Sequence, residues 1–449
     1  GFKKIISDKG GQAIGILGSQ RTTNEEGHLL KRLATDIIQT PYIDHLMTSE
    51  GALLNESFKR LSAHPASLED VEVAQAIVVI GTNLEDSNPF TRLKVIRNQY
   101  REIGKVITIH SSDSGLRGYI QHEIKPEYGK EPVIIDLLST ALNGSSTDES
   151  IQAAAKTLAS AERRVILFGR ETISHPLRDS YVQAIENLVA ELNKLGNGIT
   201  KVLWLPEYNN SRGAYDTGLV PSENVYGWGQ MVDTLNSGTM QGLYIVGENP
   251  LERVTTGKSE VKTALEKVPF LVVQDMFLTE TAAMADVVFP ACSFAEKDGT
   301  FVSGEGLAQR ITAAFQPKGA SKPDWQILML LANALGADWN YSDPKDISLE
   351  MKNTIPAFSS VDYGQLGRDG LRLSYQAPEQ PEAKTTDLSG LKALPALSDF
   401  EFHLVTENML YHSGSMTRAA SVLNQLCNTG HATLSLKDAQ RLGISENQT

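Results

Sequence analysis

Residues 271–310 constrain the fold of this chain more than any other part of its sequence. An apolar run at 270–273 is short enough to be a buried strand. The polar residues at 279–281 then predict the start of a short helix, because threonine side chains accept hydrogen bonds from the first free N–H groups of a helix. A second apolar run follows at 287–289 and ends at Pro290. This order of strand, turn, helix and strand predicts a β-α-β unit.

The rest of the chain repeats this alternation of short apolar runs and amphipathic stretches. The runs that predict strands lie at residues 13–17, 76–80, 105–109, 164–168, 202–205 and 243–246. The stretches between them predict helices, including a long one through residues 182–195. Strands that alternate with helices are typical of parallel sheets with crossover helices, so we expect an α/β fold.

Composition excludes several classes of protein. With 449 residues the chain is too long for one compact core, so two or three domains are expected. Its 54 acidic and 41 basic residues give a formal net charge of -13, which argues against binding nucleic acid. No run approaches the roughly 18 apolar residues of a membrane span, so no direct span is expected. The two cysteines, Cys292 and Cys427, lie far apart and cannot build a zinc or iron–sulfur site alone.

Short motifs carry a resemblance to a known family. They are TETA at 279–282, ADVVFPA at 285–291, EKDGTF at 296–301 and the basic residue Arg310. In this order, after a buried strand, they resemble the molybdopterin oxidoreductase family. The resemblance covers almost the whole chain. It implies two Rossmann-like parallel-sheet domains of the formate dehydrogenase and DMSO reductase type, plus the start of a truncated C-terminal β-barrel domain.

The resemblance also implies a discontinuous domain organisation. The expected parts are a first α/β domain (residues 1–40, 146–295 and 316–375), a second α/β domain (41–145), a β segment of the cluster-side domain (296–315), a linker (376–398) and the start of a molybdopterin-dinucleotide-binding-like barrel (399–449). The linker is expected because its prolines and charges interrupt the apolar periodicity. A strand at 401–406 would open the barrel.

Ligands of parallel sheets bind beyond the carboxyl ends of the strands, where glycine lets a phosphate approach the backbone. The family resemblance adds two further places to the candidates at the strand ends, the turn after residues 270–273 and one histidine. The candidate cofactor-binding residues, expected as remnants of a pterin cleft, are Gly81, Asn83, Gly247, Asn249, Asp275, Thr279, Glu280, Thr281 and His412. Further candidates for binding a phosphate or a neighbouring subunit are Arg21, Arg170, Arg212 and Arg418. No catalytic residue and no metal ligand is predicted.

Two departures from the family pattern bear on function. Catalytic members carry a metal ligand soon after the position of His45, whereas this chain continues as LMTSEG at 46–51, where the context of Ser49 does not match. Cofactor-binding members carry D-P-R after the strand at 105–109. This chain has His110, Ser111 and Ser112 there, which removes an arginine suited to holding phosphate.

A family fold without the metal ligand resembles the C-terminal part of the large iron–sulfur subunit of respiratory NADH:quinone oxidoreductase (complex I). This resemblance implies an electron-transfer and scaffold subunit that is inactive alone, in a parent complex that passes electrons from NADH to quinone. Iron–sulfur clusters are expected in a part preceding residue 1, and no cofactor in the present chain. The implied partners are other peripheral-arm subunits, at the cytoplasmic face of the cell membrane.

Two alternatives stay open. The first is the catalytic subunit of a molybdenum or tungsten bis-pterin oxidoreductase such as formate dehydrogenase. It would need Ser49 or another residue as metal ligand, and it would need molybdopterin to bind despite the sequence at 110–112. The second is a binding module that keeps a nucleotide in one half of the cleft without a metal. Metal analysis tests the first alternative, and release of GMP or oxidised pterin on denaturation tests the second.

Overall fold

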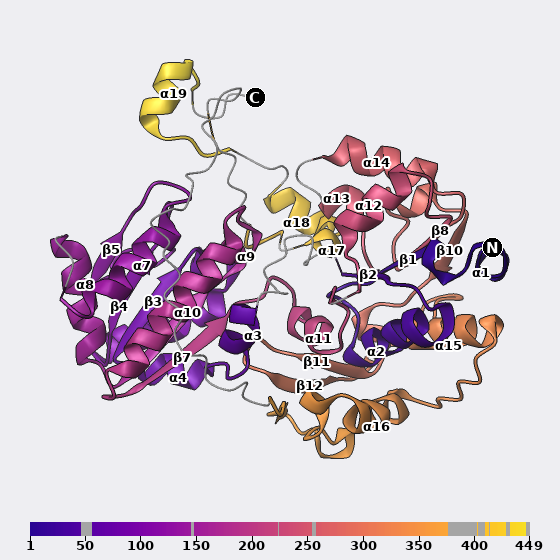
Figure 1. Cartoon of the computed structure of the whole chain (residues 1–449), viewed down its shortest axis with the longest axis horizontal. Helices are drawn as coiled ribbons and strands as arrows, with labels where there is room; N and C mark the ends of the chain where they lie inside the picture. The colour runs from indigo at the N-terminus through magenta and orange to yellow at the C-terminus, as the bar shows by residue number, and fades with distance from the viewer. Residues whose placement is uncertain are drawn as a thin grey trace. The chain divides into compact units, whose positions relative to one another are not determined.

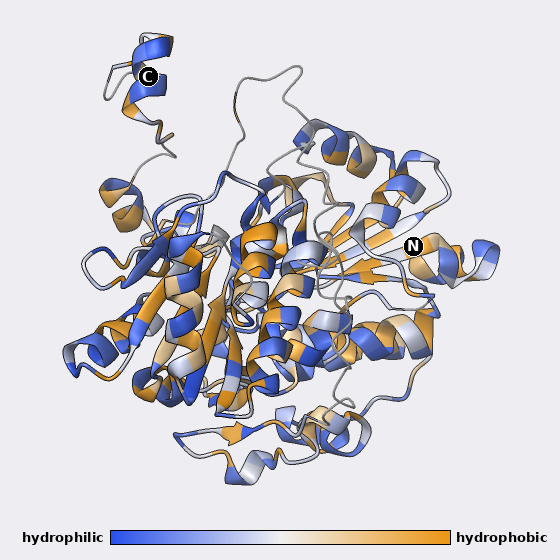
Figure 2. Cartoon of the chain, turned by 60° about the vertical axis from the view of Figure 1, so that its left-hand side comes forward, coloured by the Kyte–Doolittle hydropathy of each residue, from blue (hydrophilic) through white to orange (hydrophobic). Residues whose placement is uncertain are grey.

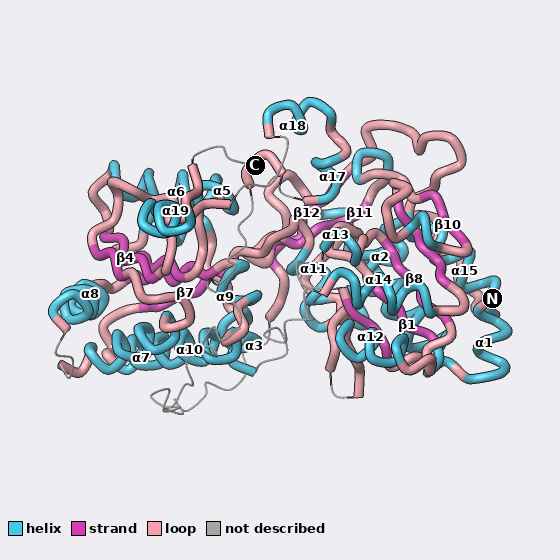
Figure 3. The backbone as a smooth tube through the Cα atoms, turned by 90° about the horizontal axis from the view of Figure 1, so that it is seen from above, coloured by secondary structure: helices cyan, strands magenta, loops and turns pink. Residues whose placement is uncertain are grey.

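The computed structural model describes residues 1–45, 56–144, 148–222, 224–253, 257–375, 402, 409–412, 414–427 and 432–445. The chain forms two compact units, Gly1–Val405 and Thr406–Thr449. Two parallel sheets lie in the first unit, and Figure 3 shows them as separate groups of strands. The expected α/β class with parallel sheets is confirmed.

The first sheet, sheet A, has the strand order β10-β9-β8-β1-β2 (Figure 1). Its strands are β10 (Val287–Pro290), β9 (Leu271–Asp275), β8 (Gly242–Val246), β1 (Ile14–Leu17) and β2 (Tyr42–Asp44). All neighbouring pairs are parallel, and Ile16 pairs with Ile43 on one side and Tyr244 on the other. Strands β1, β8 and β9 are buried along their whole length, as continuous apolar runs in a parallel sheet require.

The second sheet, sheet B, has the strand order β5-β4-β3-β6-β7 and is also parallel throughout. Its strands are β5 (His122–Ile124), β4 (Lys105–Ile109), β3 (Ala76–Ile80), β6 (Arg163–Phe168) and β7 (Ile199–Trp204). Figure 2 shows the hydrophobic character of its strands. Leu138 of α7 (Glu131–Ala141) and Ile185 of α10 (Arg178–Lys194) share one core with Val78.

Strand pairing differs from the domain boundaries expected from the sequence. Strands β6 and β7 were expected in the first α/β domain, yet they pair with each other and β6 pairs with β3 of sheet B. Strand β2 was expected in the second domain, yet it pairs with β1 of sheet A. The physical reason is that backbone hydrogen bonding between strands, not their order along the chain, decides which sheet a strand joins.

A small antiparallel sheet follows sheet A along the chain. Strand β12 (Leu307–Ile311) lies between β11 (Gly299–Val302) and β13 (Leu371–Arg372). Strands β11 and β12 lie in the β segment expected at 296–315, and β13 comes from more than fifty residues downstream. This sheet therefore joins a distant part of the chain to β12, the strand that pairs with the end of the EKDGTF motif.

Helix ends in this unit follow ordinary capping chemistry. Helix α2 (Asn24–Arg32) begins with a capping box, in which Thr23 accepts from the N–H of Glu26 and the Glu26 side chain accepts from the N–H of Thr23. It packs against α15 (Asp324–Leu335) and α16 (Pro344–Thr354). The other helices of this unit are α1 (Phe2–Lys9), α3 (Glu56–Ser62), α4 (Leu68–Val73), α5 (Leu84–Ser87), α6 (Pro89–Tyr100), α8 (Glu149–Ser160), α9 (Arg170–Ser174), α11 (Ser211–Asp216), α12 (Trp228–Asn236), α13 (Pro250–Arg253) and α14 (Lys258–Lys267).

The described residues of the second unit form α17 (Ser415–Arg418), α18 (Ser421–Leu426) and α19 (Leu436–Leu442), with an isolated bridge between Met409 and His412. The linker expected at 376–398 lies outside the described residues, as does the strand expected at 401–406 apart from Phe402. Among the described helices of both units, none combines the length and apolar character needed to cross a membrane.

Candidate functional site

The carboxyl ends of sheet A bring together several residues singled out from the sequence. Gly247 follows β8 with a φ of +64°, and a Cβ on it would lie 3.3 Å from the Cβ of Ser19, in the turn after β1. Glycine is therefore required where these two turns pass each other. The Thr281 hydroxyl donates to Asn249 Oδ1 at 2.6 Å, which joins the turn after β9 to the turn after β8.

Asp275, the last residue of β9, carries an unsatisfied acceptor at this edge. Its Oδ1 accepts from the N–H of Phe277 at 2.9 Å. Its Oδ2 is buried and has no hydrogen-bond partner among the described residues. Burial raises the pKa of this carboxyl to about 6, against the smaller opposing effects of Phe277 and Arg21. A ligand that donates a hydrogen bond would satisfy Oδ2, because buried polar atoms are usually paired.

The remaining residues of the turn after β9 have structural roles. Thr279 Oγ1 accepts at 3.1 Å from the N–H of Ala282, the first residue of the short 3-10 helix that follows. Glu280 lies at the surface and pairs with Lys258 at 2.9 Å. The turn therefore contributes Asp275 and Thr281 to the interior of the site, while Thr279 and Glu280 point to other partners.

At the carboxyl end of sheet B the candidate residues are occupied by local contacts. Asn83 Oδ1 accepts from the N–H groups of Glu85 and Asp86, so its side chain caps α5. Gly81 has a φ of +52°, and a Cβ there would lie 2.7 Å from Thr172 Oγ1. His110 Nε2 is hydrogen-bonded to the carboxylate of Glu171, which follows β6.

The two carboxyl edges meet at Glu207, which follows β7 of sheet B. Its Oε2 lies 2.9 Å from Nη2 of Arg253, which ends α13 after β8 of sheet A. The same oxygen lies 3.5 Å from Nε of Arg170, the first residue of α9. The Arg253 guanidinium also contacts Tyr208, donating to its hydroxyl and lying 4.6 Å from the ring centroid. We call Arg170, Glu207, Tyr208 and Arg253 the cleft cluster.

Burial and charge act on the cleft cluster in opposite directions. Burial acts to lower the pKa of Arg253, but Glu207 and Tyr208 outweigh it and raise that pKa above its ordinary value. Burial raises the pKa of the Tyr208 phenol to about 12. Arg253 is therefore a permanent cation held against a carboxylate where the two sheets meet.

Sequence reasoning selected Arg170 but missed Glu207, Tyr208 and Arg253. Glu207 and Tyr208 follow the strand expected at 202–205, so their place at a strand end was a usable signal. Arg253 lies at the end of α13, the short helix that follows β8, so it does not directly follow a strand and its place in the sequence carries no comparable signal.

Arg21 and His45 extend this neighbourhood. Arg21 donates to the carbonyl of Gly247 and lies 3.9 Å from a carboxylate oxygen of Glu248. His45 is fully buried, and its Nδ1 lies 2.6 Å from the carbonyl of Leu219. Burial lowers the pKa of His45 to about 4, and the positive charge of Arg253 acts in the same direction. The neutral ring must then donate from Nδ1, which leaves an Nε2 lone pair without a partner among the described residues.

Three other residues selected from the sequence lie elsewhere. Arg212 is buried, pairs with Asp216 at 2.9 Å and lies 4.3 Å from the centroid of the Tyr375 ring, so it holds the fold together. His412 and Arg418 belong to the second unit. There, His412 Nε2 lies 2.6 Å from the carbonyl of Cys427.

A second ionic cluster lies inside the first unit, around Lys297 of the EKDGTF motif. The Lys297 ammonium lies 2.7 Å from Glu26 of α2 and 2.6 Å from Asp324 of α15. Asp324 also accepts from the side-chain amide of Gln274 in β9 at 2.7 Å. We call Lys297, Glu26 and Asp324 the core cluster. It ties the motif, two helices and sheet A together.

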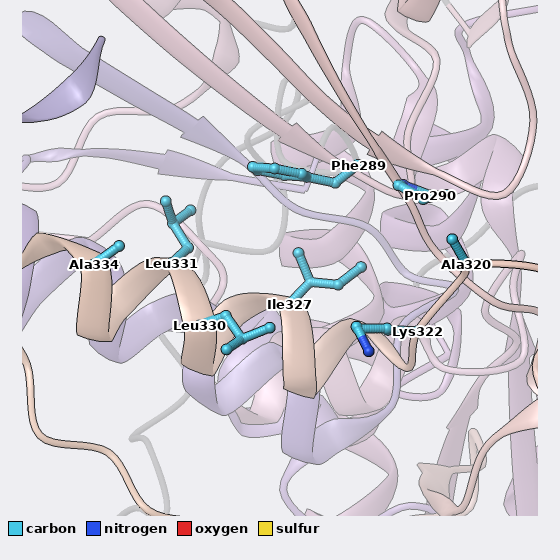
Figure 4. Close-up of a pocket in the computed structure, with 8 residues that line it drawn as sticks. All are labelled: Phe289, Pro290, Ala320, Lys322, Ile327, Leu330, Leu331 and Ala334. Atoms are coloured by element: carbon cyan, nitrogen blue, oxygen red, sulfur yellow. The ribbon is translucent and has the colours of Figure 1, made fainter.

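An apolar groove lies between β10 and α15. Figure 4 shows Phe289 and Pro290 of β10 opposite Ile327 and Leu331 of α15. Lys322 is the one charged residue of the groove's lining, so the groove lacks the paired polar groups that chemistry needs. Within the described ranges, no three His, Cys, Asp or Glu side chains are placed to hold a metal ion. Ser49 lies outside those ranges.

Comparison with known proteins identifies the family. The sequence profile described as Molybdopterin oxidoreductase matches residues 2–334. A Staphylococcus haemolyticus protein named "Putative formate dehydrogenase" is 29% identical, over 93% of this chain and 50% of its own length. A Staphylococcus aureus protein with the same name is 27% identical, over 99% of this chain and 54% of its own length. The chain thus spans about half the length of these curated relatives.

Solved structures agree in fold. The acetylene hydratase of Pelobacter acetylenicus aligns with a TM-score of 0.65 at 14% identity, over 83% of this chain and 62% of its own. A chain of the formyltransferase/hydrolase complex of Methylorubrum extorquens aligns with a TM-score of 0.55 at 12% identity, over 75% of this chain and 96% of its own. At these identities the likeness shows the fold alone. None of these four proteins is named as a subunit of complex I. Because the family profile covers well over half of the sequence, the chain belongs to the molybdopterin oxidoreductase family.

Proposed function

We propose that this chain is the cofactor-cleft part of a molybdenum or tungsten pterin oxidoreductase of the formate dehydrogenase kind. The observation that carries the proposal is the buried Asp275 Oδ2 at the carboxyl end of sheet A, an acceptor without a partner among the described residues. The relatives named as formate dehydrogenases support the reaction class. These comparisons favour this reading over the complex I subunit expected from the sequence.

The residues at the carboxyl end of sheet A fit a pterin dinucleotide. Asp275 offers an acceptor for a ring N–H or amino group. Gly247 lets the turn after β8 pass close to Ser19 in the turn after β1, which shapes this edge of the sheet. Arg21 and Arg253 supply guanidinium groups, which suit phosphate oxygens. When bound, the metal–pterin group would supply the redox centre that accepts electrons from the substrate.

The chain's own residues would hold and shield this group. His45 would remain neutral at pH 7 because its pKa lies near 4, so it could accept a hydrogen bond at Nε2 without adding a charge. The buried strands of sheet A exclude water from one side of the cleft.

A second candidate is the cofactor-free scaffold and electron-relay subunit with iron–sulfur clusters in a preceding part and other subunits as partners. The hydrogen bond between His110 and Glu171 favours it. His110 stands after β4, where cofactor-binding relatives carry an arginine, and its ring is already bonded to Glu171. Both candidates place this chain in a redox assembly, but only the first requires a metal–pterin group in it.

Metal and pterin analysis of the full-length parent, purified without oxygen, decides between them. Stoichiometric molybdenum or tungsten with extractable pterin supports the pterin oxidoreductase. Iron without these two metals or pterin would rule out the first candidate and support the scaffold subunit. Formate-dependent reduction of an artificial electron acceptor by the metal-loaded parent then tests the substrate class.

A further inference from the structure

The cleft cluster has the composition of an anion-binding site that already contains an anion. Arg170 and Arg253 come from different sheets, and their guanidinium groups converge on one carboxylate oxygen of Glu207 at 3.5 and 2.9 Å. The Tyr208 hydroxyl accepts a hydrogen bond from the Arg253 guanidinium and so helps to position it. Two arginines that converge on one carboxylate oxygen are donors of the kind that proteins use to bind phosphate.

The position of Glu207 explains why the positively charged Arg170 and Arg253 can lie close together. Without an anion between them, two partly buried guanidinium groups would repel each other and lose hydration. Arg21 and Glu248 lie in the same neighbourhood, 3.9 Å apart, and the negative charge of Glu248 also acts on Arg253. The Glu207 carboxylate therefore offsets part of the positive charge of the two arginines in the absence of a ligand.

The cluster retains enough access for an exchange of anions. The side chains of Glu207, Arg253 and Arg170 are 8%, 18% and 25% exposed. Glu207 also lies in the segment after β7, three residues beyond the strand end, where the backbone is not held by strand pairing. A carboxylate in this position can rotate away when a stronger, multivalent anion arrives.

We propose that Glu207 is an internal competitor for a phosphate site made by Arg170 and Arg253. A phosphate or diphosphate group binds where the carboxylate now lies, and binding requires Glu207 to leave the two arginines. This inference rests on the proposed function, since a pterin dinucleotide would bring such a group into the cleft. Glu207 thus sets the affinity of the cleft for its anionic ligand and offsets part of the positive charge when no ligand is bound.

The experiment measures binding of inorganic pyrophosphate and of GDP to the 449-residue chain by calorimetry. Glu207→Gln keeps the shape of the side chain but removes its charge, so we expect both probes to bind roughly tenfold more tightly, because the competent state no longer has to displace an internal anion. Arg253→Gln in the same background should remove that gain. Equal gains for both probes indicate a site that recognises phosphate alone, and a larger gain for GDP indicates contacts to the nucleoside as well.

Glu280→Gln is the matched control. It removes the same charge from the surface pair with Lys258, so it should leave both affinities unchanged. The proposal is overturned if Glu207→Gln binds pyrophosphate no more tightly than the unmodified chain, or if Glu280→Gln gives the same gain. Thermal melting checks that each variant is folded. Should Glu207→Gln not fold, Glu207→Asp provides the second test, since its shorter carboxylate competes less well and must also tighten binding.

These outcomes separate the inference from the proposed function. If the parent contains metal and pterin but Glu207→Gln does not change pyrophosphate binding, Glu207 is not a competitor for phosphate, and the proposed function is still supported. If the parent contains neither metal nor pterin while Glu207→Gln tightens pyrophosphate binding, the anion site stands without the proposed cofactor.

Discussion

The core cluster and the cleft cluster both pair buried or partly buried cations with acids, but they differ in their access to water. In the core cluster, Lys297 is 4% exposed and Glu26 is fully buried. In the cleft cluster, the arginines keep about a fifth of their side-chain surface exposed. Ions sealed in a low-dielectric interior depend entirely on each other, whereas ions near solvent can exchange partners. One cluster therefore fixes the fold, and the other can take part in binding.

The largest expected effect comes from removing the cation of the core cluster. Lys297→Met leaves Glu26 and Asp324 buried without a counter-ion, so we expect a loss of about 3–5 kcal/mol in the free energy of unfolding. Urea unfolding followed by tryptophan fluorescence measures it. Lys318→Met, at an exposed position between β12 and α15, is the control. If Arg253→Met proved as costly as Lys297→Met, the distinction between the two clusters would fail.

The burial of His45 in the cleft should make the stability of the protein depend on pH. Its folded pKa near 4 lies below the unfolded value of about 6.5, so the unfolded state binds a proton first as pH falls. Its contribution to stability is therefore fully present above pH 6.5 and is lost as pH falls towards 4, by an amount on the order of 3 kcal/mol. His45→Asn should flatten this part of the stability profile. His64→Asn, at an exposed site, should leave it unchanged.

The pH dependence of stability that Asp275 contributes should have the opposite sign to that of His45. Its folded pKa of about 6 lies above the unfolded value near 3.9, so the folded state binds the proton first and stability falls as pH rises from about 4 to 6. Asp275→Asn removes this cost and should stabilise the ligand-free chain by on the order of 2 kcal/mol at pH 7.5. The gain should vanish at pH 3.5. The same change at the exposed Asp233 should give no gain at either pH, and a loss of stability for Asp275→Asn would contradict the cost of its burial.

The smallest effect is expected at the exposed pair between Lys258 and Glu280. Because water solvates both ions, Glu280→Gln should leave the melting temperature unchanged within the error of calorimetry. A clear decrease would mean that the turn after β9 depends on this surface contact, and it would weaken the contrast between buried and exposed ion pairs.

The sequence pointed to several of the residues that the structure brings to the carboxyl end of sheet A. Gly247 and Asn249 could be found because each follows an apolar strand, and parallel strands bring their carboxyl ends to one edge. Asp275 and Thr281 were selected through the family resemblance of the turn after residues 270–273. Gly81 and Asn83 follow the same rule, but they lie on the other sheet, and the Asn83 side chain caps a helix. A pattern along the chain shows that a residue lies at a strand end. It does not show whether its side chain is already used by a neighbour.

What the sequence determined by itself is the family, the α/β class and the position of most strands, because an apolar run and a helix cap are local properties. What only the tertiary structure decided is which sheet each strand joins and which charges meet. The transfer of β6 and β7 to sheet B, and the meeting of Glu207 with Arg253, depend on contacts between residues far apart in the chain. Such contacts follow from how two complete sheets pack, and this packing is not encoded in any single segment.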